Sequence, residues 1–169
     1  SATTQVRNAL ARLVDTVLQN VVNAGTNGVI YAGGKTSRAS LGAGDTVAHT
    51  DLNRGTSWLR SSNAAGLQPF EGEYYVGVVH PAVANDLMNN TGTGSYNDVG
   101  RYTSIDAMRA GKMGDFRGIR FISYAYQNFF NSTVPVSPIT LLGEQSFGWG
   151  YFQQPEAILV TTADSNNPL

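Results

Sequence analysis

Residues 74–88 read YYVGVVHPAVANDLM and contain a complete change from strand to helix. The first six residues, Tyr74–Val79, are aromatic, β-branched or glycine, a composition typical of a β-strand. Pro81 suits the first turn of a helix, because an amide hydrogen at that position would have no partner within the helix. Four apolar residues then recur at helical spacing and predict a buried face: Val83, Ala84, Leu87 and Met88. The sequence thus predicts a strand that runs directly into a helix.

A long amphipathic helix is predicted at the start of the chain. Its apolar residues recur at intervals of three and four: Val6, Leu10, Leu13, Val14, Val17, Leu18, Val21 and Val22. We expect Thr3 or Thr4 as the N-cap and Gly25 as the residue that ends the helix. About 20 residues at ~1.5 Å each span about 30 Å. Because the opposite face is polar, we expect the helix to lie on a larger body.

The rest of the chain mixes helices and strands. A helix is expected near Asp51, with Thr50 as its cap and Gly55 weakening it, and another at Ser104–Ala110. Strands are expected at 29–31, 119–126, 139–142 and 157–162, and loops at 33–48, 89–95 and 129–138. Helices and strands do not alternate regularly, which favours an α+β class over a doubly wound sheet.

Composition and charge exclude several classes of protein. The chain has 169 residues, which fits one domain, and a formal net charge of -1, which disfavours a dedicated nucleic-acid binder. The absence of cysteine excludes disulfides, thiolate metal sites and a cysteine nucleophile. No apolar run reaches the ~18 residues of a membrane helix. Because the sequence opens at Ser1 just before a helix, we expect that upstream residues have been removed.

Only His49 and His80 could support imidazole chemistry. A catalytic triad on His80 would draw its other members from Asp51, Asp86, Ser95 and Ser146. The Gly-x-Ser-x-Gly pattern of hydrolases is absent, so we favour a capping or packing role for His80. The acidic residues and histidines lack metal-ligand spacing, and the Gly-rich segments do not continue as phosphate loops. The sequence therefore predicts no catalytic residue, no metal and no cofactor.

Basic residues gather between positions 101 and 120, where they are interleaved with aspartates. These five residues are the candidate inter-subunit contacts: Arg101, Arg109, Lys112, Arg117 and Arg120. Two interpretations stay open, a solvated face whose charges pair with one another and a patch of salt bridges between subunits, which suits the bidentate geometry of Arg. The aromatic run 147–152 is either a ligand platform or, as we favour, packing.

Three ordered blocks resemble the major capsid proteins of tailed bacteriophages, in particular the N-four-like family. The first block is the strand, His-Pro and helix of residues 74–88. The second is KMGDFRGIRF, residues 112–121, which matches the family string Lys-x-Gly-x-x-x-Gly-Val/Ile-Arg-Phe. The third is LLGEQSFGWGY, residues 141–151, which is similar to a strand, Gly and aromatic run late in these proteins. The resemblance covers about residues 4–168.

The resemblance implies the Hong Kong 97-type capsid fold, which belongs to the α+β class. Residues 1–27 would form the spine helix of the peripheral domain, and residues 28–169 the axial domain with part of the peripheral domain. The N-terminal arm and the extended loop of that fold have no counterpart here, so we expect a fragment. The loop 33–48 has no counterpart in the family that can be placed.

The resemblance also implies a structural function without catalysis, that of a coat protein that self-assembles into an icosahedral shell around phage DNA. Its implied partners are further copies in hexamers and pentamers, DNA bound without sequence recognition, and scaffolding and portal proteins, with no membrane. Its implied location is the virion, assembled in the bacterial cytoplasm. The expected contacts are the loops near 89–98 and the stretch 101–120. Two alternatives remain, a small hydrolase using His80 and a carbohydrate- or surface-binding module using the aromatic run 147–152.

Overall fold

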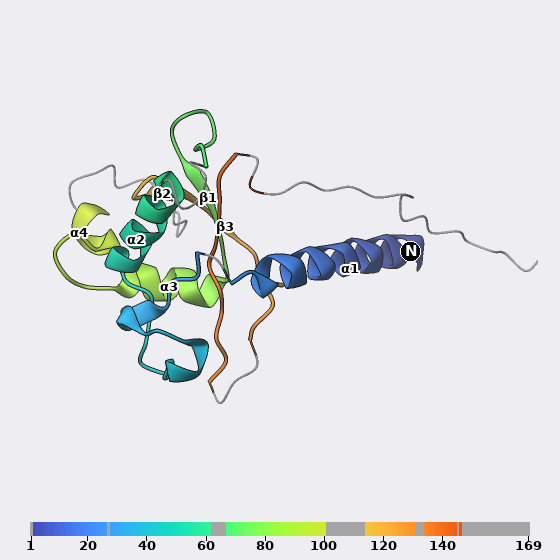
Figure 1. Cartoon of the computed structure of the whole chain (residues 1–169). Coiled ribbons are helices and arrows are strands. Elements are labelled where there is room, and N and C mark those ends of the chain that lie inside the picture. The colour runs from blue at the N-terminus through green and yellow to red at the C-terminus, as the bar shows by residue number, and fades with distance from the viewer. Residues whose placement is uncertain are drawn as a thin grey trace, which may run out of the picture.

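The computed structural model describes residues 2–26, 28–61, 67–100, 114–130, 134–144 and 146. Within these residues, helices and a small mixed sheet form an α+β arrangement (Figure 1), as the sequence predicted. The helices are α1 (Ala2–Ala24), α2 (His49–Arg60), α3 (Pro81–Asn89) and α4 (Tyr96–Gly100). The strands are β1 (Tyr75–Val79), β2 (Asp115–Phe116), β3 (Ile119–Ser123) and β4 (Thr140–Leu142).

The described sheet has the strand order β2-β3-β1-β4, with β1 parallel to β3 and antiparallel to β4. The predicted strand and helix of residues 74–88 are confirmed as β1 and α3, and the strand predicted at 139–142 is confirmed as β4. β3 ends at Ser123, before the predicted end at residue 126, because the chain turns at residues 125 and 126. The two-residue strand β2 and the one-turn helix α4 were not predicted, since elements this short have no periodicity.

The apolar core lies between the sheet and three helices, α2, α3 and α4, which all lie on one side of the sheet (Figure 1). Its buried residues are Leu52, Val79, Ala84, Leu87, Tyr96, Phe116 and Ile119. Burial alternates along β1: Tyr75, Gly77 and Val79 are buried, while Val76 and Val78 are half-buried. The sheet therefore has one covered face and one more open face.

Two glycines allow close packing within this core. A Cβ atom on Gly77 would lie 2.7 Å from Ile119 Cγ2 and 3.2 Å from the ring of Phe121. On Gly55 of α2, a Cβ would lie 2.8 Å from Leu141 Cδ1 on β4. The sequence analysis assigned Gly55 a weakening effect on its helix, but the tertiary structure gives it a packing role that no local pattern shows.

The start of α2 differs from the prediction. The helix begins at His49, so its N-cap is Ala48, and the prediction of Thr50 as the cap was wrong. Ala48 has no side-chain acceptor for the first amides of the helix. Asp51 lies three residues later and accepts a hydrogen bond from the Ala48 amide at 3.1 Å. The carboxylate thus stabilises this end of the helix from within its first turn.

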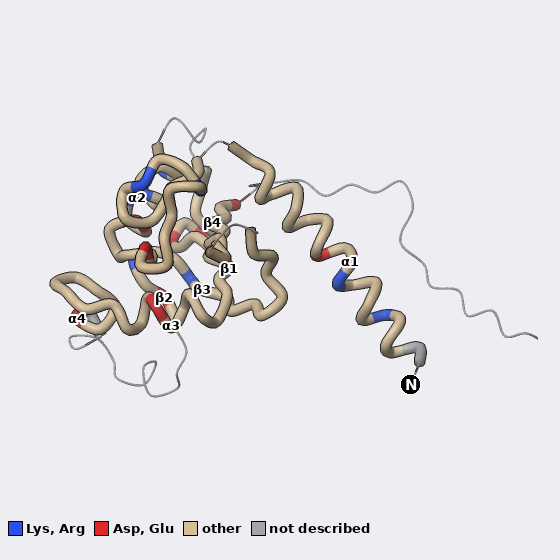
Figure 2. The backbone as a smooth tube through the Cα atoms, turned by 90° about the horizontal axis from the view of Figure 1, so that it is seen from below, with Lys and Arg blue, Asp and Glu red and all other residues tan. Residues whose placement is uncertain are grey.

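The helix α1 confirms the predicted opening helix, but it begins at Ala2, so the prediction of Thr3 or Thr4 as its N-cap was wrong. The helix projects away from the sheet on the side opposite α2, α3 and α4 (Figures 1 and 2). The predicted loop 33–48 contains just two short 3-10 segments, η1 (Ala32–Gly34) and η2 (Arg38–Ser40), and residues 29–31 form no strand. Four predicted features lie outside the described residues: the helix 104–110, the aromatic run 147–152, the strand 157–162 and most of the third resemblance block.

Candidate assembly surfaces

Residues 115–121 of the second resemblance block form most of the β2–β3 hairpin. Its two-residue loop consists of Arg117 and Gly118, whose φ angles are 57° and 75°. Positive φ at both loop positions matches the right-handed twist of the flanking strands. The Phe121 amide also donates to the Gly114 carbonyl at 3.2 Å. The glycine spacing of the block is therefore used to build a tight hairpin.

Arg120 holds the two strands of this hairpin together on its exposed side. Its Nε and Nη2 atoms each donate to one carboxylate oxygen of Asp115 at 2.9 Å. These hydrogen bonds lower the pKa of Asp115 and raise that of Arg120. The guanidinium also lies 3.7 Å from the centre of the Tyr74 ring. Arg120 thus has partners within its own chain, while 46% of its side chain remains exposed.

Arg117 connects the hairpin to the loop before α4. Its Nη2 atom donates to the Gly94 carbonyl at 2.7 Å. Of the five predicted contact residues, the structure therefore describes Arg117 and Arg120, and it brings both to one hairpin. The other three, Arg101, Arg109 and Lys112, lie outside the described residues.

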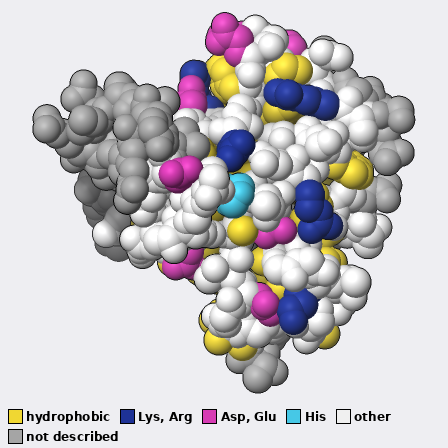
Figure 3. All heavy atoms as spheres, turned by 90° about the vertical axis from the view of Figure 1, so that its left-hand side faces the viewer, with side chains coloured by type: hydrophobic (Ala, Val, Ile, Leu, Met, Phe, Trp, Pro, Cys, Tyr) yellow, Lys and Arg dark blue, Asp and Glu magenta, His cyan; other side chains and the backbone are white. Residues whose placement is uncertain are grey.

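The loop near 89–98 has a fixed base and an exposed tip. The Gly94 amide donates to Asp98 Oδ2 at 2.7 Å, and the Asp98 amide donates to Ser95 Oγ at 3.3 Å. Ser95 is buried, whereas residues 91–93 are exposed. On the side of the molecule that carries α4, acidic and basic side chains are interleaved rather than gathered by sign (Figure 3). This surface suits contacts in which charges of both signs are paired.

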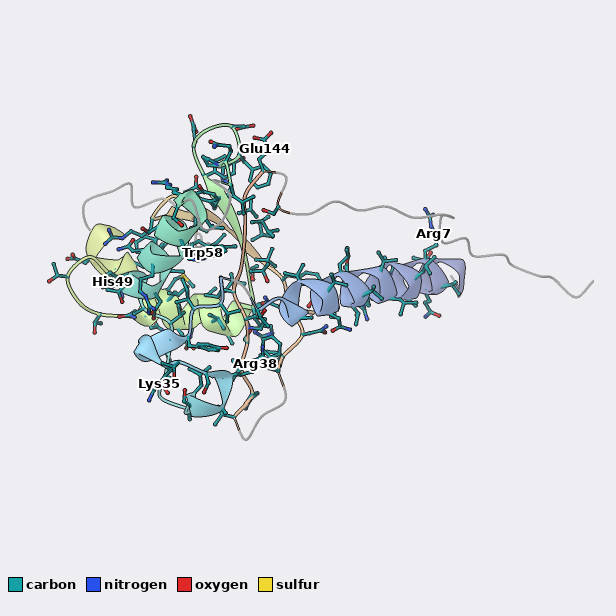
Figure 4. All side chains as sticks on the ribbon, viewed as in Figure 1. Arg7, Lys35, Arg38, His49, Trp58 and Glu144 are labelled. Carbon is teal, nitrogen blue, oxygen red and sulfur yellow. The ribbon has the colours of Figure 1, made fainter. Side chains whose placement is uncertain are left out.

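The two histidines have structural positions. His80 Nδ1 accepts a hydrogen bond from the Ala82 amide at 3.2 Å, which makes His80 the N-cap of α3. Its ring meets the edge of Phe129, with the ring centres 4.8 Å apart. The expected capping role of His80 is confirmed. His49 opens α2 (Figure 4), and its buried Nδ1 has no hydrogen-bond partner among the described residues.

The open face of the sheet and α1 form a surface that the sequence analysis did not find. A cleft of about 290 Å³ lies between them, with apolar walls from Leu18, Val22, Val78, Ile122 and Leu142. Polar contacts hold the helix there: Tyr124 Oη donates to Asp15 Oδ2 at 2.7 Å, and the Asn128 amide donates to Gln19 Oε1 at 2.7 Å. Helical periodicity identified the apolar residues of α1 but not which side of the helix meets the sheet.

The loop 33–48 lines part of a larger groove, which has a volume of about 570 Å³. Its walls come from the segments 29–47, 129–130 and 134–141 and from α2 and α3. The Arg38 guanidinium lies 3.4 Å from the centre of the Phe130 ring and connects the two segments (Figure 4). Within the loop, Asp45 accepts from the Gly42 amide at 2.8 Å and lies 3.8 Å from Lys35 Nζ. Arg38 thus anchors the loop to Phe130, and Asp45 holds two parts of the loop together.

Among the described residues, no group of three or more histidine, aspartate or glutamate side chains is placed to hold a metal ion. None of the helices in the described ranges has the length and hydropathy needed to cross a membrane.

Comparison with known proteins produced no match. No family model fits the chain, and no curated protein and no solved structure is significantly similar to it.

Proposed function

We propose that this chain is part of the major capsid protein of a tailed phage or prophage, and that it assembles with copies of itself into hexamers and pentamers of a shell around DNA. In this proposal the shell has the Hong Kong 97-type architecture. The chain acts through contact surfaces rather than through catalysis.

The observation that carries the proposal is that the described parts of the three resemblance blocks meet in one sheet. Residues 74–88 supply β1 and α3, residues 112–121 supply β2 and β3, and the third block begins within β4. β1 lies between β3 and β4 and pairs with both. Because segments far apart in the sequence form neighbouring strands, the three blocks support the likeness as one structural unit rather than as three separate coincidences.

The surface of the described part also supports the proposal. The β2–β3 hairpin and the loop at residues 91–93 lie next to each other, joined by the hydrogen bond from Arg117 to Gly94. Both carry exposed groups on a rigid base. Shell subunits need such small, repeated polar contacts more than one deep site, because symmetry multiplies each contact.

The test is electron microscopy with light scattering on the complete product of the gene, expressed alone and brought to high concentration. Closed particles of uniform diameter are the expected result. A species that stays monomeric at every concentration, both alone and with the phage's scaffolding protein, would count against the proposal.

A further inference from the structure

The main apolar stripe of α1 faces away from the body of the protein. Its side chains Val6, Leu13, Val17 and Val21 are 49%, 60%, 47% and 68% exposed. At about 100° per residue, the four lie within an arc of about 80° on the helix surface. The side chains that hold α1 to the sheet side of the molecule, Arg12, Asp15 and Gln19, lie about 160° away round the helix. Figure 1 shows that α1 projects from the body of the protein and that no other described element covers its projecting part.

An exposed stripe of this kind favours an apolar cover. Moving an aliphatic side chain out of water is favourable, because the apolar surface that it exposes to water is removed. The stripe carries no charged side chain, so its occupant should be uncharged as well, because an unpaired buried charge is strongly unfavourable. Arg7, at the projecting end of the helix (Figure 4), lies beside the stripe rather than in it.

One segment of the chain outside the described residues has this character. Residues 157–162 read AILVTT, four apolar residues followed by two threonines, and the sequence predicts a strand there. The segment carries no charge. Apolar residues occur on both faces of such a strand, so at least one face needs a cover.

The connection is long enough for this segment to reach the stripe. Leu142, the last residue of β4, lines the same cleft as Leu18 and Val22 of α1, so β4 ends near the helix. Beyond it, the Glu144 amide donates to the Gln68 carbonyl, and the Gly143 amide donates to Ser146 Oγ. Ten residues, 147–156, lie between Ser146, the last described residue, and Ala157. From Ser146 to Ala157 this linker extends up to about 36 Å, which is comparable with the length of about 34 Å that the 23 residues of α1 span.

We infer that residues 157–162 pack along the stripe of Val6, Leu13, Val17 and Val21 and cover it within the same chain. A tether of this length holds the segment near the helix at millimolar effective concentration. In dilute solution the segment therefore competes well against a second copy of α1. The inference does not depend on the proposed function, because it concerns a contact within one subunit.

The natural absence of cysteine allows a direct test by disulfide cross-linking in the full chain. Leu159→Cys is combined in turn with Val6→Cys, Leu13→Cys, Val17→Cys and Val21→Cys, and each double variant is oxidised at low concentration with oxidised glutathione. The matched control is Thr16→Cys with Leu159→Cys, because Thr16 is also exposed but lies about 100° round the helix from Val17. Non-reducing electrophoresis, intact mass and free-thiol counts identify the products.

The expected result is a disulfide within one chain for at least one stripe position, formed at least tenfold faster than in the Thr16 control. A disulfide between two chains would show that a second copy covers the stripe and would overturn the inference. So would cross-linking no faster than the control at all four positions. Shell formation by the wild-type protein is measured separately. A negative cross-linking result therefore does not contradict the proposed function, and a failure to form shells does not contradict this inference.

Discussion

At the scale of single residues, the fold depends on positions where backbone or ring atoms approach closely. Gly77 lies in the central strand, against Ile119 and Phe121 of the neighbouring strand. Ile119 is fully buried and β-branched, so it has little freedom to move aside. Glycine at this position is required by the packing rather than by an unusual backbone angle.

Gly77→Ala should therefore lower the free energy of unfolding by about 1–3 kcal/mol, the usual effect of overfilling a packed core. Urea denaturation followed by tryptophan fluorescence measures the change. Gly44→Ala is the matched control, since a Cβ there meets nothing within 4 Å. Equal stability of the two variants would show that the neighbouring strand moves enough to accept a Cβ atom at Gly77 without cost.

His80 contributes at the same scale through its imidazole acceptor. His80→Ala removes the cap of α3 and should destabilise the protein by about 1 kcal/mol, whereas His80→Asn keeps a side-chain acceptor and should recover most of that loss. Thermal unfolding of the two variants checks this. A His80→Asn protein as unstable as His80→Ala would point to the ring contact with Phe129 instead of the cap.

At the scale of elements, α1 is the helix whose position depends most on a few polar contacts. The hydrogen bond from Tyr124 to Asp15 raises the pKa of Tyr124 above its usual value. Arg12 Nη2 donates to Tyr126 Oη at 2.9 Å, and its guanidinium also stacks on the same ring. Docking of this helix is therefore sensitive to the ionisation of tyrosine.

The folded-state pKa of Tyr124 lies above its unfolded value of about 10. The stabilisation from this hydrogen bond is thus fully present below about pH 10 and is lost as the pH rises through the raised pKa. Between about pH 8 and about pH 11, the melting temperature of the wild type should fall further than that of Tyr124→Phe. Tyr31→Phe serves as the control and should follow the wild type. Parallel curves for wild type and Tyr124→Phe would contradict a role for this bond.

At the scale of the whole molecule, the basic stretch 101–120 is the predicted contact between subunits. The described arginines of the stretch already have partners in their own chain, Asp115 for Arg120 and Gly94 for Arg117. A contact between subunits would use the parts of these two arginine side chains that remain exposed to solvent. The hairpin geometry brings the two side chains to one exposed element.

Arg109→Glu and Arg117→Glu should each reduce the yield of closed shells at least tenfold while changing the melting temperature by a few degrees at most. Electron microscopy counts the shells, and circular dichroism follows unfolding. Arg54→Glu on α2 is the matched control, because Arg54 is also exposed and paired with a nearby aspartate, Asp51. Normal shell yields from both test variants would remove this patch from the assembly contacts.

The sequence by itself determined the elements with a strong local signal. The spacing of apolar residues in α1 and the strand, proline and helix of residues 74–88 are local patterns, and both elements form as predicted. The α+β class follows from their irregular order. The identity and spacing of neighbouring residues suffice for such predictions, because helix and strand periods repeat within a few residues.

The tertiary structure alone decided which surfaces meet. α1 docks by a mixed polar edge instead of its main apolar stripe, Gly55 admits Leu141, and Arg120 stacks on Tyr74 while it pairs with Asp115. Each of these contacts joins residues that other parts of the chain bring together. Their energies depend on distances set by the whole fold, which no period in the sequence encodes.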